Sequence, residues 1–218
     1  MSGEREEARE RPLPLYCAES ARNRAAFRAD GPRPKRLEGF DFDRNPNVLP
    51  ETVGDLKSTS WVRDGRPLVL IGDSGTGESH LLIGVGTAIA EAGLSVRYTT
   101  TSALVNELAE ADAARPLSSV IARYSKVDLL CPDEFGYLNL EKKGARLLFQ
   151  IFTEREERKA TAVATNSPFA EWDGIFADPR LCAAIADRIT FRCTLIQTCT
   201  ESYRYQATEA ESRAKPMP

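Results

Sequence analysis

Residues 68–93 read "LVLIGDSGTGESHLLIGVGTAIAEAG", and this stretch decides the fold. The continuous apolar run at 68–71 is typical of a strand that is covered on both faces of a sheet. After Ser79, apolar residues recur at helical spacing until Gly93, which predicts a helix. A glycine-rich turn lies between the two, so the stretch predicts a strand, a loop and a helix in immediate succession.

The turn at residues 72–79 nearly matches the loop that cradles nucleotide phosphates. That loop reads Gly, four residues, Gly, Lys, then Ser or Thr; Gly72, Gly77 and Ser79 stand in register, but Glu78 replaces the lysine. Backbone N–H groups of such a turn and the following helix N-terminus attract an anion. The predicted ligands are ATP and Mg²⁺, with the Ser79 hydroxyl on the metal, and an ordinary turn is the alternative. The predicted nucleotide-binding residues are Gly72, Asp73, Ser74, Gly75, Thr76, Gly77, Glu78, Ser79 and His80.

Glu78 reverses the sign of the charge beside the phosphates. Two unit charges about 4 Å apart interact by roughly 1 to 4 kcal/mol, so a carboxylate here loses attraction and adds repulsion. Magnesium, the backbone N–H groups and the helix dipole could still hold a nucleotide weakly, but stabilisation of the transferring phosphoryl group should suffer. We therefore expect ATP hydrolysis to be weak or absent.

Strand and helix patterns alternate along the rest of the chain, and Ser102 is a reasonable N-cap for the second helix. This alternation predicts an α/β fold of the P-loop NTPase type, with an open, mostly parallel five-stranded sheet and helices on both faces. Ligands of such sheets bind at the carboxyl ends of the strands, where the glycine turn lies. After the first strand and helix, the predicted strands are 95–100, 127–134, 161–166 and 194–199, and the predicted helices are 101–113, 141–159 and 178–189.

Two acids, Asp133 and Glu134, stand at the carboxyl end of a predicted strand. In a loop-type NTPase the first acid holds Mg²⁺ and the second polarises the attacking water as general base. An isolated acid pair is more often a solvated turn, but the position after a glycine loop favours a functional role. Pro132 removes a backbone N–H from what should be an inner strand, a fault that could misplace Asp133.

Two further side chains are candidates for catalysis. Asn166 ends the next predicted strand, where an amide could orient water or contact the γ-phosphate, although Asn is also a common turn former. Arg188 or Arg192 could reach the nucleotide of a neighbouring subunit as an arginine finger, which offsets transition-state charge. A surface arginine on a helix is the alternative, and it is the favoured reading for Arg192.

Residues 1–46 are rich in charge and proline, which predicts an N-terminal arm outside the core and a domain at 47–218. The arm holds a cluster of basic residues with few acids nearby. This cluster predicts weak, sequence-independent contact with double-stranded DNA, and a solvated tail is the alternative. The basic residues are Arg22, Arg24, Arg28, Arg33, Lys35 and Arg36.

The composition sets outer limits on the function. A chain of 218 residues with 42% hydrophobic content can bury one sizeable core, and its net charge of -3 argues against a surface that traps nucleic acid everywhere. Five scattered cysteines and a single histidine indicate neither a disulfide framework nor a transition-metal site. Neither a membrane span nor a signal peptide is visible in the sequence, so a cytoplasmic location is predicted.

An ordered series of motifs resembles the IstB-like ATP-binding proteins, helpers of insertion-sequence transposases that are related to the helicase loader DnaC within the AAA+ ATPases. The series includes "GDSGTGESHLLIGVG", "DLLCPDEFGYL", "ATNSPFAEW" and "ADPRLCAAIADRI" and covers most of the chain. The resemblance implies a DNA-associated homo-oligomer that binds ATP and assists a transposase. By matching position it makes Asp133 and Glu134 the metal and water acids, Asn166 the first sensor and Arg188 the finger.

The chain departs from this family at three places. Family members carry lysine where Glu78 stands and an aliphatic residue where Pro132 stands, and their N-terminal DNA-binding region is longer. The leading function is therefore an ATP-binding transposition helper with weakened hydrolysis. The alternatives are a catalytically inactive adaptor or decayed mobile-element remnant that acts by protein contacts, and a small-molecule kinase, for which a basic lid segment is lacking.

Overall fold

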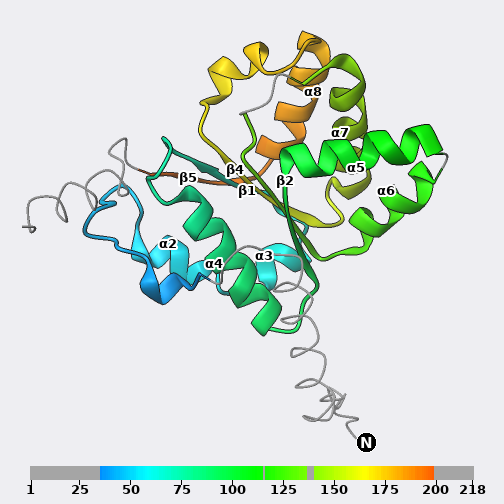
Figure 1. Ribbon diagram of the computed structural model, residues 1–218. Coiled ribbons are helices and arrows are strands. Elements are labelled where there is room, and N and C mark those ends of the chain that lie inside the picture. The colour runs from blue at the N-terminus through cyan, green and yellow to red at the C-terminus, as the bar shows by residue number, and fades with distance from the viewer. Residues whose placement is uncertain (1–34, 115, 137–139, 199–218) are drawn as a thin grey trace, which may run out of the picture.

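The computed structural model describes residues 35–114, 116–136 and 140–198, and within them one parallel sheet lies between two layers of helices (Figure 1). The sheet has five strands in the order β2-β3-β4-β1-β5, and every neighbouring pair is parallel. This arrangement confirms the predicted α/β fold. The strands are β1 Leu68–Ile71, β2 Val96–Thr100, β3 Leu129–Asp133, β4 Ala160–Thr165 and β5 Thr194–Gln197.

The helices cover both faces of the sheet (Figure 1). On one face α4 packs across β1 to β4, with η1, α2 and α3 beside it, and on the other face lie α5, α6, α7 and α8. None of the described helices has the length and apolar character that crossing a bilayer requires. Their bounds are η1 Leu37–Gly39, α2 Pro50–Asp55, α3 Ser60–Arg63, α4 Glu78–Glu91, α5 Thr101–Ala114, α6 Leu117–Lys126, α7 Lys142–Arg155, η2 Phe169–Gly174 and α8 Pro179–Thr190.

The central strand β1 shows why the sheet is buried on both faces. Leu68 and Leu70 belong to the core beneath α4, whereas Val69, between them, belongs to the core beneath the opposite helices. All three side chains are fully buried. Because alternate side chains of a strand point to opposite faces, a strand covered on both faces must be apolar throughout, as this one is.

The sequence patterns predicted the four long helices α4, α5, α7 and α8 but missed the shorter helix α6. Its apolar residues Leu117, Val120, Ile121 and Tyr124 recur at helical spacing and pack on the core. The predicted N-cap of α5 is also wrong. Ser102 lies inside that helix, and the side chain of the preceding strand residue, Thr100, accepts the N–H of Ala103 at 3.2 Å.

The described part of the predicted arm, residues 35–46, lies against α4, so the core begins before residue 47. Leu37 and Phe40 are buried, and a Cβ added at Gly84 would stand 2.7 Å from the Leu37 side chain, so only glycine allows this close approach. Arg36, predicted to lack a nearby acid, forms an ion pair with Glu91 at 2.7 Å. The remainder of the arm, including the basic residues from 22 to 33, lies outside the described residues.

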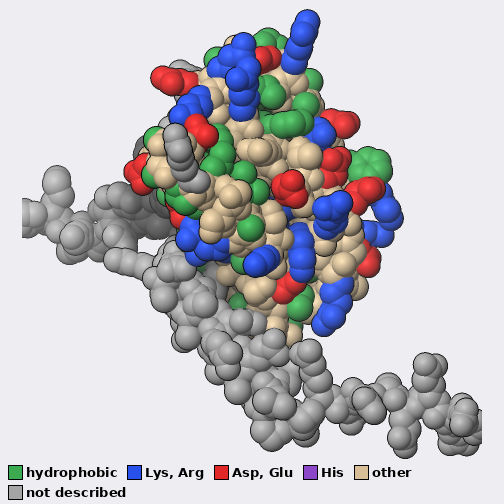
Figure 2. Space-filling model, turned by 90° about the vertical axis from the view of Figure 1, so that its right-hand side faces the viewer, with side chains coloured by type: hydrophobic (Ala, Val, Ile, Leu, Met, Phe, Trp, Pro, Cys, Tyr) green, Lys and Arg blue, Asp and Glu red, His purple; other side chains and the backbone are tan. Residues whose placement is uncertain are grey.

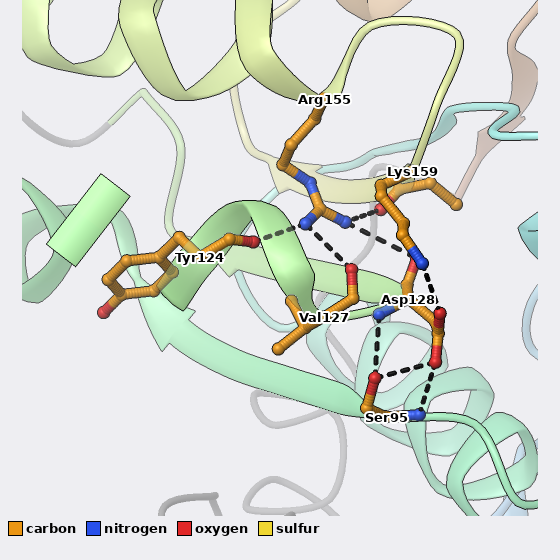
Figure 3. Close-up of polar contacts among 7 residues, drawn as sticks. Ser95, Tyr124, Val127, Asp128, Arg155 and Lys159 are labelled. Carbon is orange, nitrogen blue, oxygen red and sulfur yellow. Dashed lines mark hydrogen bonds and ion pairs between the residues drawn. The ribbon is translucent and has the colours of Figure 1, made fainter. Parts of the chain in front are cut away.

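A buried guanidinium ties together the amino ends of β3 and β4 (Figure 3). Arg155, at the end of α7, is only 1% exposed. Burial lowers the pKa of its guanidinium to about 10, which leaves it protonated at neutral pH. Its N–H groups donate to the carbonyl oxygens of Tyr124, Val127, Asp128 and Ala160 and to the hydroxyl of Thr161.

A second polar group extends this connection to the start of β2 (Figure 3). The Asp128 carboxylate accepts a bond from Lys159 Nζ at 2.6 Å and bonds from the N–H and hydroxyl of Ser95 at 3.0 and 2.7 Å. Burial raises the pKa of Asp128, but these donors outweigh it and the net pKa lies below its usual value. The amino ends of three neighbouring strands are thus held by charged groups, far from the phosphate loop.

Candidate nucleotide-binding site

The phosphate loop follows β1 at the carboxyl edge of the sheet and leads directly into α4. Gly77 has a φ of 108°, a conformation that residues with a side chain rarely adopt. A Cβ at Gly72 would lie 1.7 Å from the Thr198 hydroxyl, so this position also requires glycine. The loop that the spacing predicted between strand and helix is therefore present, with glycines where its geometry needs them.

Thr76 organises the inside of the loop. It is 1% exposed, and its hydroxyl lies 2.7 Å from the Asp73 carbonyl oxygen, 2.6 Å from the Thr198 hydroxyl and 3.1 Å from Glu78 Oε2. The Glu78 carboxylate therefore turns back toward the loop. In this position it adds negative charge where phosphate oxygens need positive charge.

Ser79 and Asp133 meet, as expected of two ligands to one magnesium ion. The Ser79 hydroxyl donates to Asp133 Oδ1 at 3.1 Å, and the backbone N–H of Glu134 donates to the same oxygen at 2.8 Å. Ser79 belongs to α4 and Asp133 to β3, and the two residues are 54 positions apart in sequence. The fold thus brings together a hydroxyl and a carboxylate, the hard oxygen donors that Mg²⁺ prefers.

Tyr98, which the sequence analysis missed, fixes the other side of Asp133. Its hydroxyl donates to Asp133 Oδ2 at 2.7 Å, and the Thr101 hydroxyl donates to the Asp133 carbonyl at 2.9 Å. Burial, and then the bond to Asp133, raise the pKa of Tyr98 far above its usual value, so the hydroxyl stays protonated as a donor. The only sequence signal was its place on a predicted strand.

Pro132 does not displace Asp133, so the predicted disturbance is wrong. The N–H of Leu129 donates to the carbonyl oxygen of Ser95, next to β2. Backbone N–H groups of successive strand residues point to opposite sides, so the missing N–H of Pro132 would have pointed toward β4. The pairing between β3 and β4 stops before the proline. The pairing with β2 continues to Asp133, which keeps its carboxylate beside Ser79.

A cavity of about 280 Å³, called the metal cavity below, brings most of the predicted catalytic residues together. Glu134 is exposed and has a φ of 57°, an unusual backbone conformation that recurs at functional sites. Asn166 follows the end of β4, and its buried Oδ1 has no hydrogen-bond partner among the described residues. The lining residues are Ser74, Glu78, Ser79, Asp133, Glu134, Ala164, Thr165 and Asn166.

A second cavity, of about 330 Å³ and called the base cavity below, lies on the other side of the loop. Phe40 forms part of its wall, and the His80 ring packs edge-on against Phe40 with centroids 5.7 Å apart. His80 Nε2 donates to the Arg36 carbonyl at 2.9 Å, so this side chain packs against Phe40 and anchors the backbone at residue 36. The lining residues are Lys35, Gly39, Phe40, Asp41, Asn45, Gly75, Thr76, Gly77, Glu78, Ser79 and His80.

Arg188 lies apart from the other predicted catalytic residues. It lines a cavity together with Pro67 and Thr161, which lie at the starts of β1 and β4. Arg188 therefore lies at the amino ends of the strands, whereas the loop lies at their carboxyl ends. Its guanidinium is 3.1 Å from the Glu156 carboxylate and lies over the Phe149 ring, 4.5 Å from the centroid. Arg188 therefore cannot act on the nucleotide site of its own subunit.

Comparison with known proteins gives the family of this chain. The family model described as IstB-like ATP binding protein matches residues 19–211. An insertion-sequence ATP-binding protein of Sinorhizobium fredii (strain NBRC 101917 / NGR234) is 34% identical over 86% of this chain and 63% of its own length. The IS232 ATP-binding protein of Bacillus thuringiensis subsp. berliner is 33% identical over 79% of this chain and 69% of its own length. The chain thus spans about two thirds of the length of these relatives.

Among solved structures, the replication initiator DnaA bound to AMPPCP and single-stranded DNA matches with a TM-score of 0.65 and 20% identity, over 84% of this chain and 55% of that chain. At this identity the likeness shows the fold alone, and it confirms the P-loop NTPase fold of the AAA+ type. The family match and the relatives go further than the fold. This chain belongs to the IstB-like ATP-binding protein family.

Proposed function

We propose that this protein is an ATP-binding transposition helper that assists a transposase on DNA in the cytoplasm, with ATP hydrolysis weakened by Glu78. The observation that carries the proposal is the contact between Ser79 and Asp133, 3.1 Å apart, directly beside the phosphate loop. The insertion-sequence relatives support the transposase as partner. The inactive adaptor is the second candidate, and the carboxylate of Glu78 inside the loop favours it.

The residues fit the metal half of an Mg-ATP site and fit the phosphate half poorly. Ser79 and Asp133 would hold Mg²⁺, which neutralises phosphate charge when bound. Glu134 would take a proton from the attacking water at its carboxylate, and the unpartnered Oδ1 of Asn166 would orient that water. Glu78 opposes the phosphates, so the geometry supports nucleotide binding better than turnover.

Ser79→Ala tests the proposal because it removes the hydroxyl that contacts Asp133 and would bind the metal. We expect Mg-ATP affinity, measured by isothermal titration calorimetry, to fall roughly tenfold, the effect of one hydrogen bond to a charged group. Ser118→Ala, at an exposed serine of α6, is the matched control and should change nothing. Equal Mg-ATP affinities in wild type and Ser79→Ala would contradict the assigned metal ligand, and no binding by wild type would favour the adaptor.

We propose that the protein forms homo-oligomers in which Arg188 is the arginine finger. Since this side chain lies at the opposite edge from the loop of its own subunit, it can serve only the nucleotide of another copy. We expect Mg-ATP to shift the protein to larger assemblies in light scattering, and Arg188→Ala to abolish any gain in hydrolysis on assembly. Arg180→Ala, at an exposed arginine of α8, is the control. A protein that stays monomeric at high concentration in saturating Mg-ATP would rule out the finger.

We assign DNA contact to the arm because the face of the molecule in Figure 2 mixes side chains of both charges. On the face that includes α5 and α6, Lys and Arg side chains stand among Asp and Glu (Figure 2), and Arg123, for example, pairs with Glu107. Deleting residues 1–34 spares the packed segment and should weaken duplex binding at least about tenfold, with a shallower salt dependence. The readout is fluorescence anisotropy across a salt series. Unchanged affinity at equal ionic strength would show that the arm is not the contact.

A further inference from the structure

Glu78 stands between the two cavities of the candidate site. It and Ser79 are the only residues that line both the base cavity and the metal cavity within the described parts of the chain. Gly75, Thr76 and Gly77 line only the base cavity. A nucleotide with its base in one cavity and its terminal phosphates in the other must therefore pass the Glu78 carboxylate.

The two cavities differ sharply in charge. The metal cavity is lined by three carboxylates, those of Glu78, Asp133 and Glu134, and by no lysine or arginine among the described residues. The base cavity is lined by one cationic side chain, Lys35, and two carboxylates, Asp41 and Glu78. The Phe40 ring adds a flat apolar surface of the kind on which a purine packs. The base side suits a neutral aromatic ligand, whereas the metal side repels each further anionic group that enters without a cation.

We infer that this site prefers nucleosides and nucleotides with few phosphates, and that its metal-free affinity falls with each phosphate added. The inference rests on the proposed function only in taking these cavities as a nucleotide site. Glu78 Oε2 lies 3.1 Å from the Thr76 hydroxyl. It therefore lies inside the loop, where a functional phosphate loop binds the anion. Each further unit of negative charge brought within about 4 Å of this carboxylate weakens binding about fivefold.

The test is a series of four ligands titrated into the full chain by isothermal titration calorimetry: adenosine, AMP, ADP and ATP, first in EDTA and then with Mg²⁺. In EDTA we expect adenosine and AMP to bind more tightly than ADP, and ADP more tightly than ATP. Mg²⁺ should flatten the series, because it offsets charge on the ligand and can bind Ser79 and Asp133.

Two variants assign the effect to Glu78. Glu78→Gln keeps the shape of the side chain without its charge and should flatten the metal-free series. Glu78→Lys should reverse the series so that ATP binds most tightly. Glu110→Lys makes the same change at an exposed position on α5 and should leave the order as in wild type. Circular dichroism and thermal unfolding check that each variant is folded.

The outcomes separate this inference from the proposed function. A wild-type protein that binds metal-free ATP more tightly than AMP overturns the inference while leaving ATP binding intact. An unchanged series in Glu78→Gln also overturns it, because the selectivity would then have another source. If none of the four ligands binds either wild type or Glu78→Lys, the cavities are not a nucleotide site and both proposals fail.

Discussion

Glu78→Lys is expected to tighten Mg-ATP binding by at least about 2 kcal/mol, roughly 30-fold in Kd, and to raise the rate of phosphate release. The substitution replaces repulsion with attraction at a distance of about 4 Å, and each of the two changes contributes about 1 kcal/mol or more. We expect hydrolysis to rise because other residues of the proposed site lie together: Ser79 lies 3.1 Å from Asp133, and Asn166 lines the same cavity. Calorimetry and a phosphate-release assay measure the two effects.

Pro132→Ile, combined with Glu78→Lys, shows whether the proline contributes to the defect. Since Asp133 already contacts Ser79 and Tyr98, the double variant should hydrolyse ATP no more than about twofold faster than Glu78→Lys alone. Recovery in the double variant only would contradict this view of Pro132. Wild-type turnover equal to that of Glu78→Lys would show that the loop does not need its cation.

Arg155→Met is expected to cost about 3 to 5 kcal/mol of unfolding free energy, a large part of the total stability of a domain this size. The methionine fills a similar volume but leaves buried carbonyl oxygens without donors at the starts of β3 and β4. Arg155→Lys should lose part of this stability, because an ammonium cannot reach acceptors arranged around a planar guanidinium. Urea denaturation followed by circular dichroism measures both losses.

Arg146→Met is the matched control, since Arg146 is an exposed arginine on the same helix α7. It should change the unfolding free energy by less than about 0.5 kcal/mol. A loss in Arg155→Met no larger than in this control would mean that the carbonyl oxygens find other donors, with water the obvious source. The buried network would then be a consequence of the fold rather than a support for it.

Local pattern in the sequence determined the fold and much of the site. The apolar run of β1, the glycine turn and the helical spacing of α4 are each set by neighbouring residues, so each could be predicted without knowledge of distant contacts. Parallel strands end at one edge of their sheet, which is why Asp133 and Asn166 could be placed near the loop. The replacement of lysine by Glu78 was visible because the loop pattern consists of neighbouring residues.

The sequence was less informative wherever a residue's role depends on a distant partner. Proline and charge predicted that residues 35–46 form an arm, but burial of Leu37 and Phe40 against α4 outweighs those local signals. Tyr98 looked like one more strand residue until the fold placed its hydroxyl on Asp133. Arg155 resembled any arginine at the end of an amphipathic helix, since its buried partners come from other elements.

Tertiary structure alone decided how Glu78 and Arg188 are placed. Residue type alone determines the charge of Glu78, but only the folded loop places its carboxylate beside Thr76 and between the two cavities. Sequence likewise marked Arg188 as a candidate finger, but the edge of the sheet that it occupies depends on how α8 packs on α7. Residue type and periodicity are local properties of a chain, whereas the direction in which a charge acts depends on contacts between segments far apart in sequence.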